Sequence, residues 1–111
     1  MDRIRGVFHG STCYVSDGYG AYHSRSVVMG GSAILAAADN LRTAIRAQAA
    51  QQLNCESSVV EIVEGEKAVA PGGTSVPLRG LSSQGISAEG AFLNKKHTYT
   101  YGAHAAHVAV D

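Results

Sequence analysis

Residues 26–53 form the segment that most restricts what this chain can fold into. The segment reads SVVMGGSAILAAADNLRTAIRAQAAQQL and is rich in alanine. Apolar residues recur along it at spacings of three and four: Ile34, Ala38, Leu41, Ile45 and Ala49. This spacing places them in one stripe on a helical surface. We therefore predict a long helix over residues 26–53, ended by Asn54 and Cys55.

Two adjacent glycines lie near the start of this predicted helix. Gly30 and Gly31 would each cost roughly 1 kcal/mol relative to alanine inside a helix. Such a cost requires a reason, and close approach of another backbone is the usual one. We expect either a neighbouring strand or a bound ligand to come close to these two residues.

Strands are predicted on both sides of the helix. Residues 3–8 and 12–15 have modest alternation and β-branched or aromatic content, which favours two short strands. Residues 59–70 read VVEIVEGEKAVA, which predicts a hairpin that turns at Glu64-Gly65-Glu66. Pro71-Gly72-Gly73 predicts the next turn.

The rest of the chain gives weaker signals. Residues 74–81 are expected to form an edge strand, because Pro77 removes one backbone donor from the ladder. Residues 82–96 are rich in Ser and Gly and are predicted to form a loop. Tyr99 and Tyr101, then Val108 and Val110, recur at strand spacing, so we expect a final strand, or two separated by a bend at Gly102.

Together these elements predict one domain over residues 1–111. We expect an α+β fold, with a small, mostly antiparallel sheet and one long Ala-rich helix packed on it. A chain of 111 residues can bury a single core. Hydrophobic residues make up 45% of the chain but aromatics only 6%, so that core should be thin.

The charge balance excludes some classes of partner. Lys plus Arg and Asp plus Glu number nine each, and the positive charges are scattered. Neither a nucleic acid nor an anionic membrane surface is therefore expected as a partner. The sequence shows no secretory signal and no membrane span, so we expect a cytoplasmic protein with Cys13 and Cys55 as reduced thiols.

The stretch DGYGAYHSRSVVMGGSAILAAA, residues 17–38, leads into the helix. A glycine turn, hydroxyl side chains and an arginine come before the helical residues, which is the order expected of an anion site. The first N–H groups of a helix lack internal partners, and the helix dipole adds positive potential there. Ser24 and Ser26 could either cap the helix or donate to a ligand. His23 replaces the glycine that a dinucleotide fingerprint would need, and no phosphate-binding P-loop motif is present.

Metal binding and catalysis find little support in the sequence. His104 and His107 are three residues apart, and His97 is nearby, but residues at this spacing in a strand point to opposite faces. We therefore expect no metal site. Asp17, His23 and Ser24 lie too close in sequence to converge as a catalytic triad, and no catalytic residue is assigned.

Two segments resemble the molybdenum-binding large subunit of the xanthine dehydrogenase, aldehyde oxidase and carbon monoxide dehydrogenase family. They are GYGAYHSRSVVMGGSAILAAADNLR, residues 18–42, and YTYGAHAAHVAVD, residues 99–111. In that family a glycine-rich S-R-S segment precedes an Ala-rich helix, and a strand of the second type follows at a similar separation. The segment VFHGSTCYVSDG also resembles the strand and turn that lead into this loop in the family, so the resemblance covers the whole chain.

The resemblance implies which residues contact a molybdopterin cofactor. The implied loop runs from Ala21 to Ser26, acting mainly through backbone N–H groups and the hydroxyls of Ser24 and Ser26. The six residues are Ala21, Tyr22, His23, Ser24, Arg25 and Ser26. The family's large subunit is several times longer, and its other cofactor loops and its active-site glutamate have no counterpart here.

Two functional hypotheses follow from the resemblance. In the first, the chain is a fragment or split subunit of a molybdenum hydroxylase that contributes one wall of the cofactor pocket. It would be inactive alone and would not retain molybdopterin; its partners would be the rest of the large subunit or sister subunits. In the second, it is a homo-oligomeric or subunit-association module without a cofactor, since an Ala-rich core and unpaired strand edges favour oligomers.

Overall fold

A computed structural model describes Gly6, residues 20–95, Tyr99 and residues 101–111 of the chain. A six-residue π-helix, η1 (Ser26–Gly31), continues directly into the α-helix α1 (Ser32–Leu53). A short 3₁₀ turn, η2 (Ser57–Val59), leads to the strands β1 (Glu61–Val63), β2 (Lys67–Val69) and β3 (Ser75–Pro77). The predicted strands at residues 3–8 and 12–15 lie outside the described residues.

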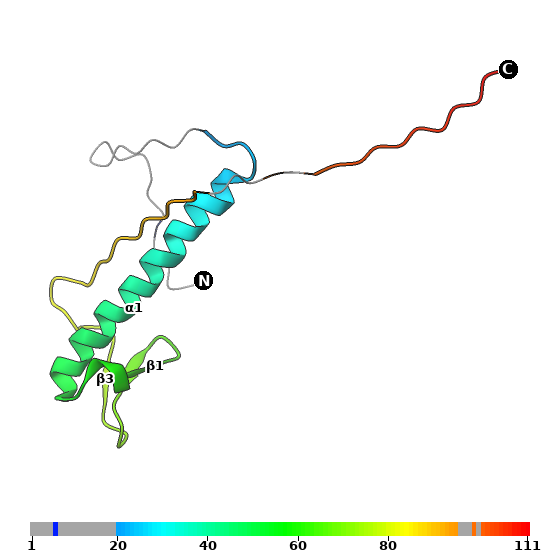
Figure 1. Cartoon of the computed structure of the whole chain (residues 1–111). Helices are drawn as coiled ribbons and strands as arrows, with labels where there is room; N and C mark the ends of the chain where they lie inside the picture. Colours follow the sequence, from blue (N-terminus) through cyan, green and yellow to red (C-terminus); the bar gives the residue numbers. More distant parts are fainter. Residues whose placement is uncertain (1–5, 7–19, 96–98, 100) are drawn as a thin grey trace.

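The three strands form one antiparallel sheet in the order β1-β2-β3. Ile62 is opposite Ala68, and Ala68 is opposite Val76. One helix with a small antiparallel sheet confirms the predicted α+β class. Figure 1 shows the sheet beside the C-terminal end of α1, while residues 101–111 extend away from the other end.

The helix begins and ends where the sequence predicts, over residues 26–53. Asn54 ends it in the left-handed conformation, with φ 52° and ψ 47°, and its N–H bonds to the carbonyl of Ala50. The Cys55 N–H reaches the same carbonyl at 3.1 Å. Asn tolerates this conformation better than other side-chain-bearing residues, which is why it can end a helix here.

The predicted hairpin, its turn and the turn that follows it at Pro71-Gly72-Gly73 are confirmed. The Glu66 N–H donates to the Val63 carbonyl at 3.0 Å. Glu64 and Gly65 between them both have positive φ, as a type I′ turn requires. The second turn is closed by a bond from the Gly73 N–H to the Ala70 carbonyl at 3.1 Å. β3 is an edge strand, and Pro77 is its last residue.

The core is small and lies at one end of the helix. Its buried residues are Ala49, Ala50, Val60, Ala68 and Leu81. Gln52 reinforces this contact, because its Nε2 donates to the Leu81 carbonyl at 3.0 Å. The helical stripe is therefore covered at its C-terminal end only: Ala49 is 0% exposed, but Ile34 is 70% exposed.

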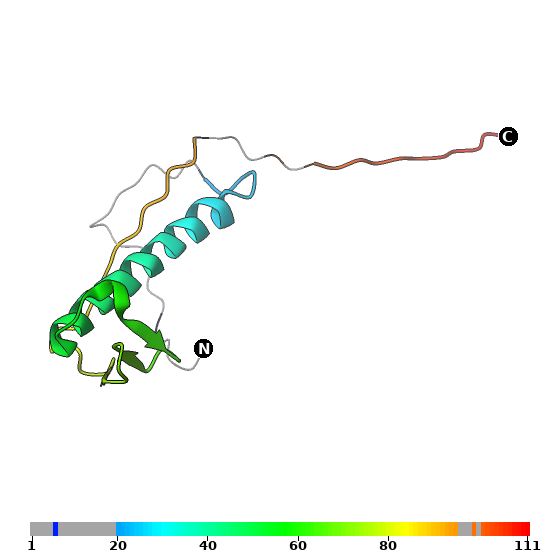
Figure 2. The same cartoon turned by 60° about the horizontal axis from the view of Figure 1, so that its bottom comes forward.

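The loop after β3 runs back along the helix. Residues 86–94 follow α1 toward its first turns in both views (Figures 1 and 2). Asn40 Nδ2 donates to the Glu89 carbonyl at 2.8 Å. Gly90 lies against the helix backbone, where a Cβ would overlap the Ala37 nitrogen and lie 2.5 Å from the Ala33 oxygen. We call residues 86–94 the strap.

The predicted final strand is wrong for the described residues. Residues 101–111 are extended and exposed but belong to no strand. A strand needs a neighbour to accept its backbone hydrogen bonds, and none of the described residues provides one. None of the helices in the described part of the chain is long and apolar enough to cross a bilayer.

Replacing Gly90 with alanine should loosen the strap. The added Cβ would meet helix backbone, which cannot rotate away as a side chain can. We expect Gly90→Ala to lower the free energy of unfolding by about 1–3 kcal/mol, measured by urea titration with circular dichroism. Gly30→Ala is the control, because a Cβ there meets nothing within 4 Å. Equal stability of the two variants would contradict the close contact.

Candidate anion-binding loop

The candidate site is the loop of residues 21–26 that leads into η1. Gly20 opens it with φ 83°. His23 and Ser24 follow with φ 51° and 59°, so two successive non-glycine residues have left-handed φ values. Arg25 then returns to helical values, with φ −61° and ψ −34°. Left-handed values cost a non-glycine residue roughly 1–2 kcal/mol, and such strain concentrates at functional sites.

Backbone hydrogen bonds hold this loop in shape. The Arg25 N–H donates to the Tyr22 carbonyl at 3.0 Å, and the Val28 N–H donates to the Ser24 carbonyl at 3.1 Å. The Arg25 and Val28 N–H groups are thus already used inside the protein. Any ligand at this loop would have to be bound by the remaining N–H groups and by side chains.

Neither serine caps the helix, although the sequence allowed it. Arg25 occupies the N-cap position, and no side chain caps there. A capping residue is normally extended, but Arg25 is helical and Ser24 has a left-handed φ, so the Ser24 hydroxyl does not serve as the N-cap. Within the described residues the two hydroxyls make no hydrogen bond, and Ser24 and Ser26 are exposed. They are therefore available to a ligand.

Three side chains cluster on the loop. The Arg25 guanidinium carbon lies 5.6 Å from the centre of the Tyr22 ring. The His23 ring meets the same ring edge to face at 5.3 Å. A cation over a tyrosine face is favoured by the ring quadrupole. Tyr22 therefore helps to set the positions of both neighbours.

The electrostatics of the loop favour an anion. Arg25 adds a full positive charge beside the positive end of the helix dipole, where cations are normally disfavoured. The first turn of η1 contains no acidic residue. Phosphate at a helix N-terminus would interact favourably with both the dipole and the guanidinium.

The two helix glycines remain open to their surroundings. A Cβ on Gly30 would meet nothing within 4 Å, and one on Gly31 would meet only Val27 Cγ1, at 4.0 Å. The expected close neighbour of Gly30 and Gly31 is thus absent from the described residues. Both glycines belong to the π-helical segment η1, a form that frequently marks functional sites.

The other candidates from the sequence do not assemble into a site. The described residues contain no group of three or more His, Cys, Asp and Glu side chains that could hold a metal. His104 and His107 are exposed on the extended C-terminal segment. Cys55 is a free, half-buried thiol; Cys13, Asp17 and His97 lie outside the described residues.

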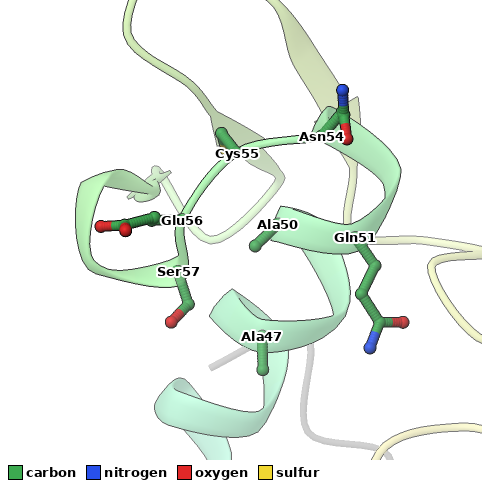
Figure 3. A pocket seen from close by; sticks show the side chains of 7 residues that line it. All are labelled: Ala47, Ala50, Gln51, Asn54, Cys55, Glu56 and Ser57. Atoms are coloured by element: carbon green, nitrogen blue, oxygen red, sulfur yellow. The ribbon is translucent and has the colours of Figure 1, made fainter.

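A hollow at the far end of α1 is not part of this loop. Figure 3 shows the residues that line it, around the last turns of α1 and the start of η2: Ala47, Ala50, Gln51, Asn54, Cys55, Glu56 and Ser57. The hollow measures about 540 Å³ and is open to solvent. The 22 residues of α1 span about 33 Å at 1.5 Å per residue, which separates it from residues 21–26.

A second, more enclosed hollow was also missed by sequence reasoning. It measures about 270 Å³ and lies between the middle of α1 and the loop after β3, lined mainly by apolar side chains, including Leu41, Ile45, Leu78 and Ile86. Only the apolar stripe through Leu41 and Ile45 hinted at it. It has no charged lining, so it does not suit an anion.

Glycine substitutions should distinguish the two serines of the loop. Ser24 has positive φ, so Ser24→Gly relieves strain, and we expect the free energy of unfolding to rise by about 0.5–1 kcal/mol. Ser26→Gly is the matched control: it places glycine in a helix and should lower stability by roughly 0.5 kcal/mol. Urea unfolding of both variants checks this. A loss of stability in Ser24→Gly would contradict the left-handed turn.

The comparisons with known proteins assign the family. A family model described as a molybdopterin cofactor-binding domain matches residues 1–111, the whole chain. Neither the curated proteins nor the solved structures contain a match to the chain. The loop that favours an anion thus lies in a sequence that carries the family pattern over its whole length. The chain belongs to the molybdopterin cofactor-binding domain family.

Proposed function

We propose that this chain contributes one wall of the molybdopterin pocket in an oxidoreductase of the xanthine dehydrogenase, aldehyde oxidase or carbon monoxide dehydrogenase type. It acts as a fragment or split subunit that the rest of the large subunit completes. The observation that carries this proposal is the family match over residues 1–111. The positive potential at the loop of residues 21–26 supports it independently, because a phosphate-bearing cofactor is an anion.

The residues of the loop fit the phosphate end of such a cofactor. Ser24 and Ser26 have exposed hydroxyls that can donate hydrogen bonds. Arg25 has a planar guanidinium group, which can donate two parallel hydrogen bonds to phosphate oxygens. Ala21, Tyr22 and His23 are exposed beside them and would form the surrounding wall. When bound, the molybdenum centre supplies the redox chemistry of the enzyme.

The chain alone supplies only part of a pocket. Ala21 to Ser24 are all exposed, so the loop faces solvent on its ligand side. Cofactor sites normally bury most of their ligand. We infer that the remaining walls belong to other polypeptide, and that the isolated chain neither retains molybdopterin nor catalyses a reaction.

Cofactor content tests this assignment. We expect no molybdenum or pterin in the chain expressed alone in a molybdate-replete host, and about one equivalent when the remainder of a large subunit is co-expressed. Elemental analysis and pterin fluorescence measure both. Stoichiometric cofactor on the isolated chain would overturn the split-pocket proposal.

The double variant Ser24→Ala/Ser26→Ala tests the loop itself. Two lost hydrogen bonds of about 1 kcal/mol each should weaken cofactor retention in the assembled protein roughly 30-fold. Ser57→Ala/Ser83→Ala is the control, since both serines are exposed and lie outside the loop. If both double variants retain the cofactor equally, the loop is not its binding site.

The alternative function is an association module without a cofactor. One observation favours it: the exposed side chains on the N-terminal half of the helix include Val27, Ile34 and Leu35. Exposed apolar groups of this size mark contact surfaces when they are contiguous. The same side chains would be covered by the rest of an enzyme, so the two functions share this surface and differ in the cofactor.

The isolated chain should therefore self-associate. We expect a dimer or larger species by light scattering coupled to size exclusion, because Ile34 and Leu35 are exposed in the described part of the chain and a second copy would bury them. Ile34→Lys/Leu35→Glu should shift the mass toward the monomer. Arg42→Glu, a change at an exposed charged position on the same helix, is the control. A stable wild-type monomer would argue against a contact surface here.

A further inference from the structure

Arg25 is placed differently from its neighbours in the loop of residues 21–26. It alone of the six residues is half-buried, whereas the other five are exposed. Its Nε atom is buried. A long charged side chain in an exposed loop normally extends into water, because holding it in one position costs rotamer entropy. An attraction within the protein therefore holds the Arg25 side chain back.

The start of the helix does not supply that attraction. The helix dipole makes the potential positive at the first turn, and a positive potential repels a cation. The first turn of η1 also contains no acidic residue that could pair with a guanidinium. An arginine at this position would turn away from the helix unless another group attracted it.

The Tyr22 ring supplies an attraction of the right kind. The guanidinium carbon of Arg25 lies 5.6 Å from the centre of that ring, inside the range of about 6 Å over which an aromatic face attracts a cation. The Arg25 N–H also donates to the Tyr22 carbonyl at 3.0 Å, so a closed turn keeps the two residues together. The His23 ring packs on the same tyrosine at an interplanar angle of 77°, which restricts the Tyr22 ring in turn.

Tyr22 makes these contacts with its ring and not with its hydroxyl. Within the described part of the chain the hydroxyl makes no hydrogen bond. The side chain is 52% exposed and lies outside the core cluster. Removing the ring should therefore release the Arg25 guanidinium and leave the fold intact.

We propose that Tyr22 is a positioning residue for Arg25, whose guanidinium receives the phosphate end of the cofactor. The ring holds the guanidinium at the loop before the cofactor arrives, so less side-chain entropy is lost on binding. Tyr22 thereby raises the affinity through Arg25 and not through a contact of its own with the phosphate. This inference rests on the proposed function, because it takes the ligand to be molybdopterin.

Nuclear magnetic resonance of the full chain tests the restraint. The heteronuclear NOE of the Arg25 Nε–H group reports motion on the ps–ns timescale. We expect Tyr22→Leu to lower this NOE to the value of Arg42, an exposed arginine that serves as the internal reference for a mobile side chain. Tyr22→Phe keeps the ring and should leave the NOE as in wild type. An unchanged NOE in Tyr22→Leu would overturn the inference.

A double-mutant cycle in the assembled protein tests the role toward the cofactor, with pterin fluorescence following the release of molybdopterin. We expect Arg25→Ala to speed release at least about tenfold, because a charged hydrogen-bond donor is lost. Tyr22→Leu should speed release about fivefold, and Tyr22→Phe should stay within about twofold of wild type, because its ring also attracts the guanidinium. The double variant Tyr22→Leu/Arg25→Ala should release molybdopterin no faster than Arg25→Ala.

Additive effects in the double variant would overturn the inference, because Tyr22 would then contact the cofactor itself. Unchanged release by Tyr22→Leu, or fast release by Tyr22→Phe, would overturn it too. Urea titration excludes a folding defect, since the midpoints of all variants should equal that of wild type. If the wild-type complex holds no molybdopterin, the proposed function is refuted, whereas the NOE still decides whether Tyr22 restrains Arg25.

Discussion

The contact between the last turns of α1 and the loop-and-sheet segment that follows organises the described part of this protein. Ala49 lies in that contact with no exposed surface, against a cluster that includes Val60, Ala68 and Leu81. Small alanine side chains let helix and sheet approach closely but bury little area per residue. Gln52 compensates in part, because its side chain links the end of the helix to the Leu81 carbonyl. The fold is thus anchored at one end of a long helix.

Among the described residues, fewer contacts hold the other end of the helix. The strap runs along it, with Gly90 pressed on the backbone of Ala33 and Ala37 and with one side-chain bond from Asn40. Large apolar side chains on the first turns stay exposed there. The candidate cofactor loop and the C-terminal segment both lie toward this end (Figure 1). These exposed surfaces are therefore grouped at one end of the helix, and they are distant from the core.

Local signals in the sequence predicted the local structure well. The apolar spacing set the helix at residues 26–53, and Gly65 and Pro71-Gly72-Gly73 set the turns of the hairpin, because turn conformations depend on the residues in them. The spacing could not distinguish π-helical from α-helical winding over Ser26–Gly31. It also placed Ile34 and Ala49 in one stripe, although the sheet covers only the second.

Long-range contacts and strain could not be predicted in the same way. No sequence feature near Gly90 predicts that it lies against the backbone of Ala33 and Ala37, because that contact joins residues more than fifty positions apart. The left-handed φ values fall on His23 and Ser24, where glycine would be the ordinary choice. The final strand failed as a prediction because its periodicity describes a side-chain pattern, whereas a strand also needs a partner backbone.

The strain at His23 and Ser24 and the charge of Arg25 point to the same physical requirement. Left-handed φ costs the loop energy, and the Arg25 guanidinium lies beside the positive end of the helix dipole, where a bound anion would interact favourably with both. A loop whose backbone is already held by the Tyr22 and Ser24 carbonyls would also lose little entropy on binding.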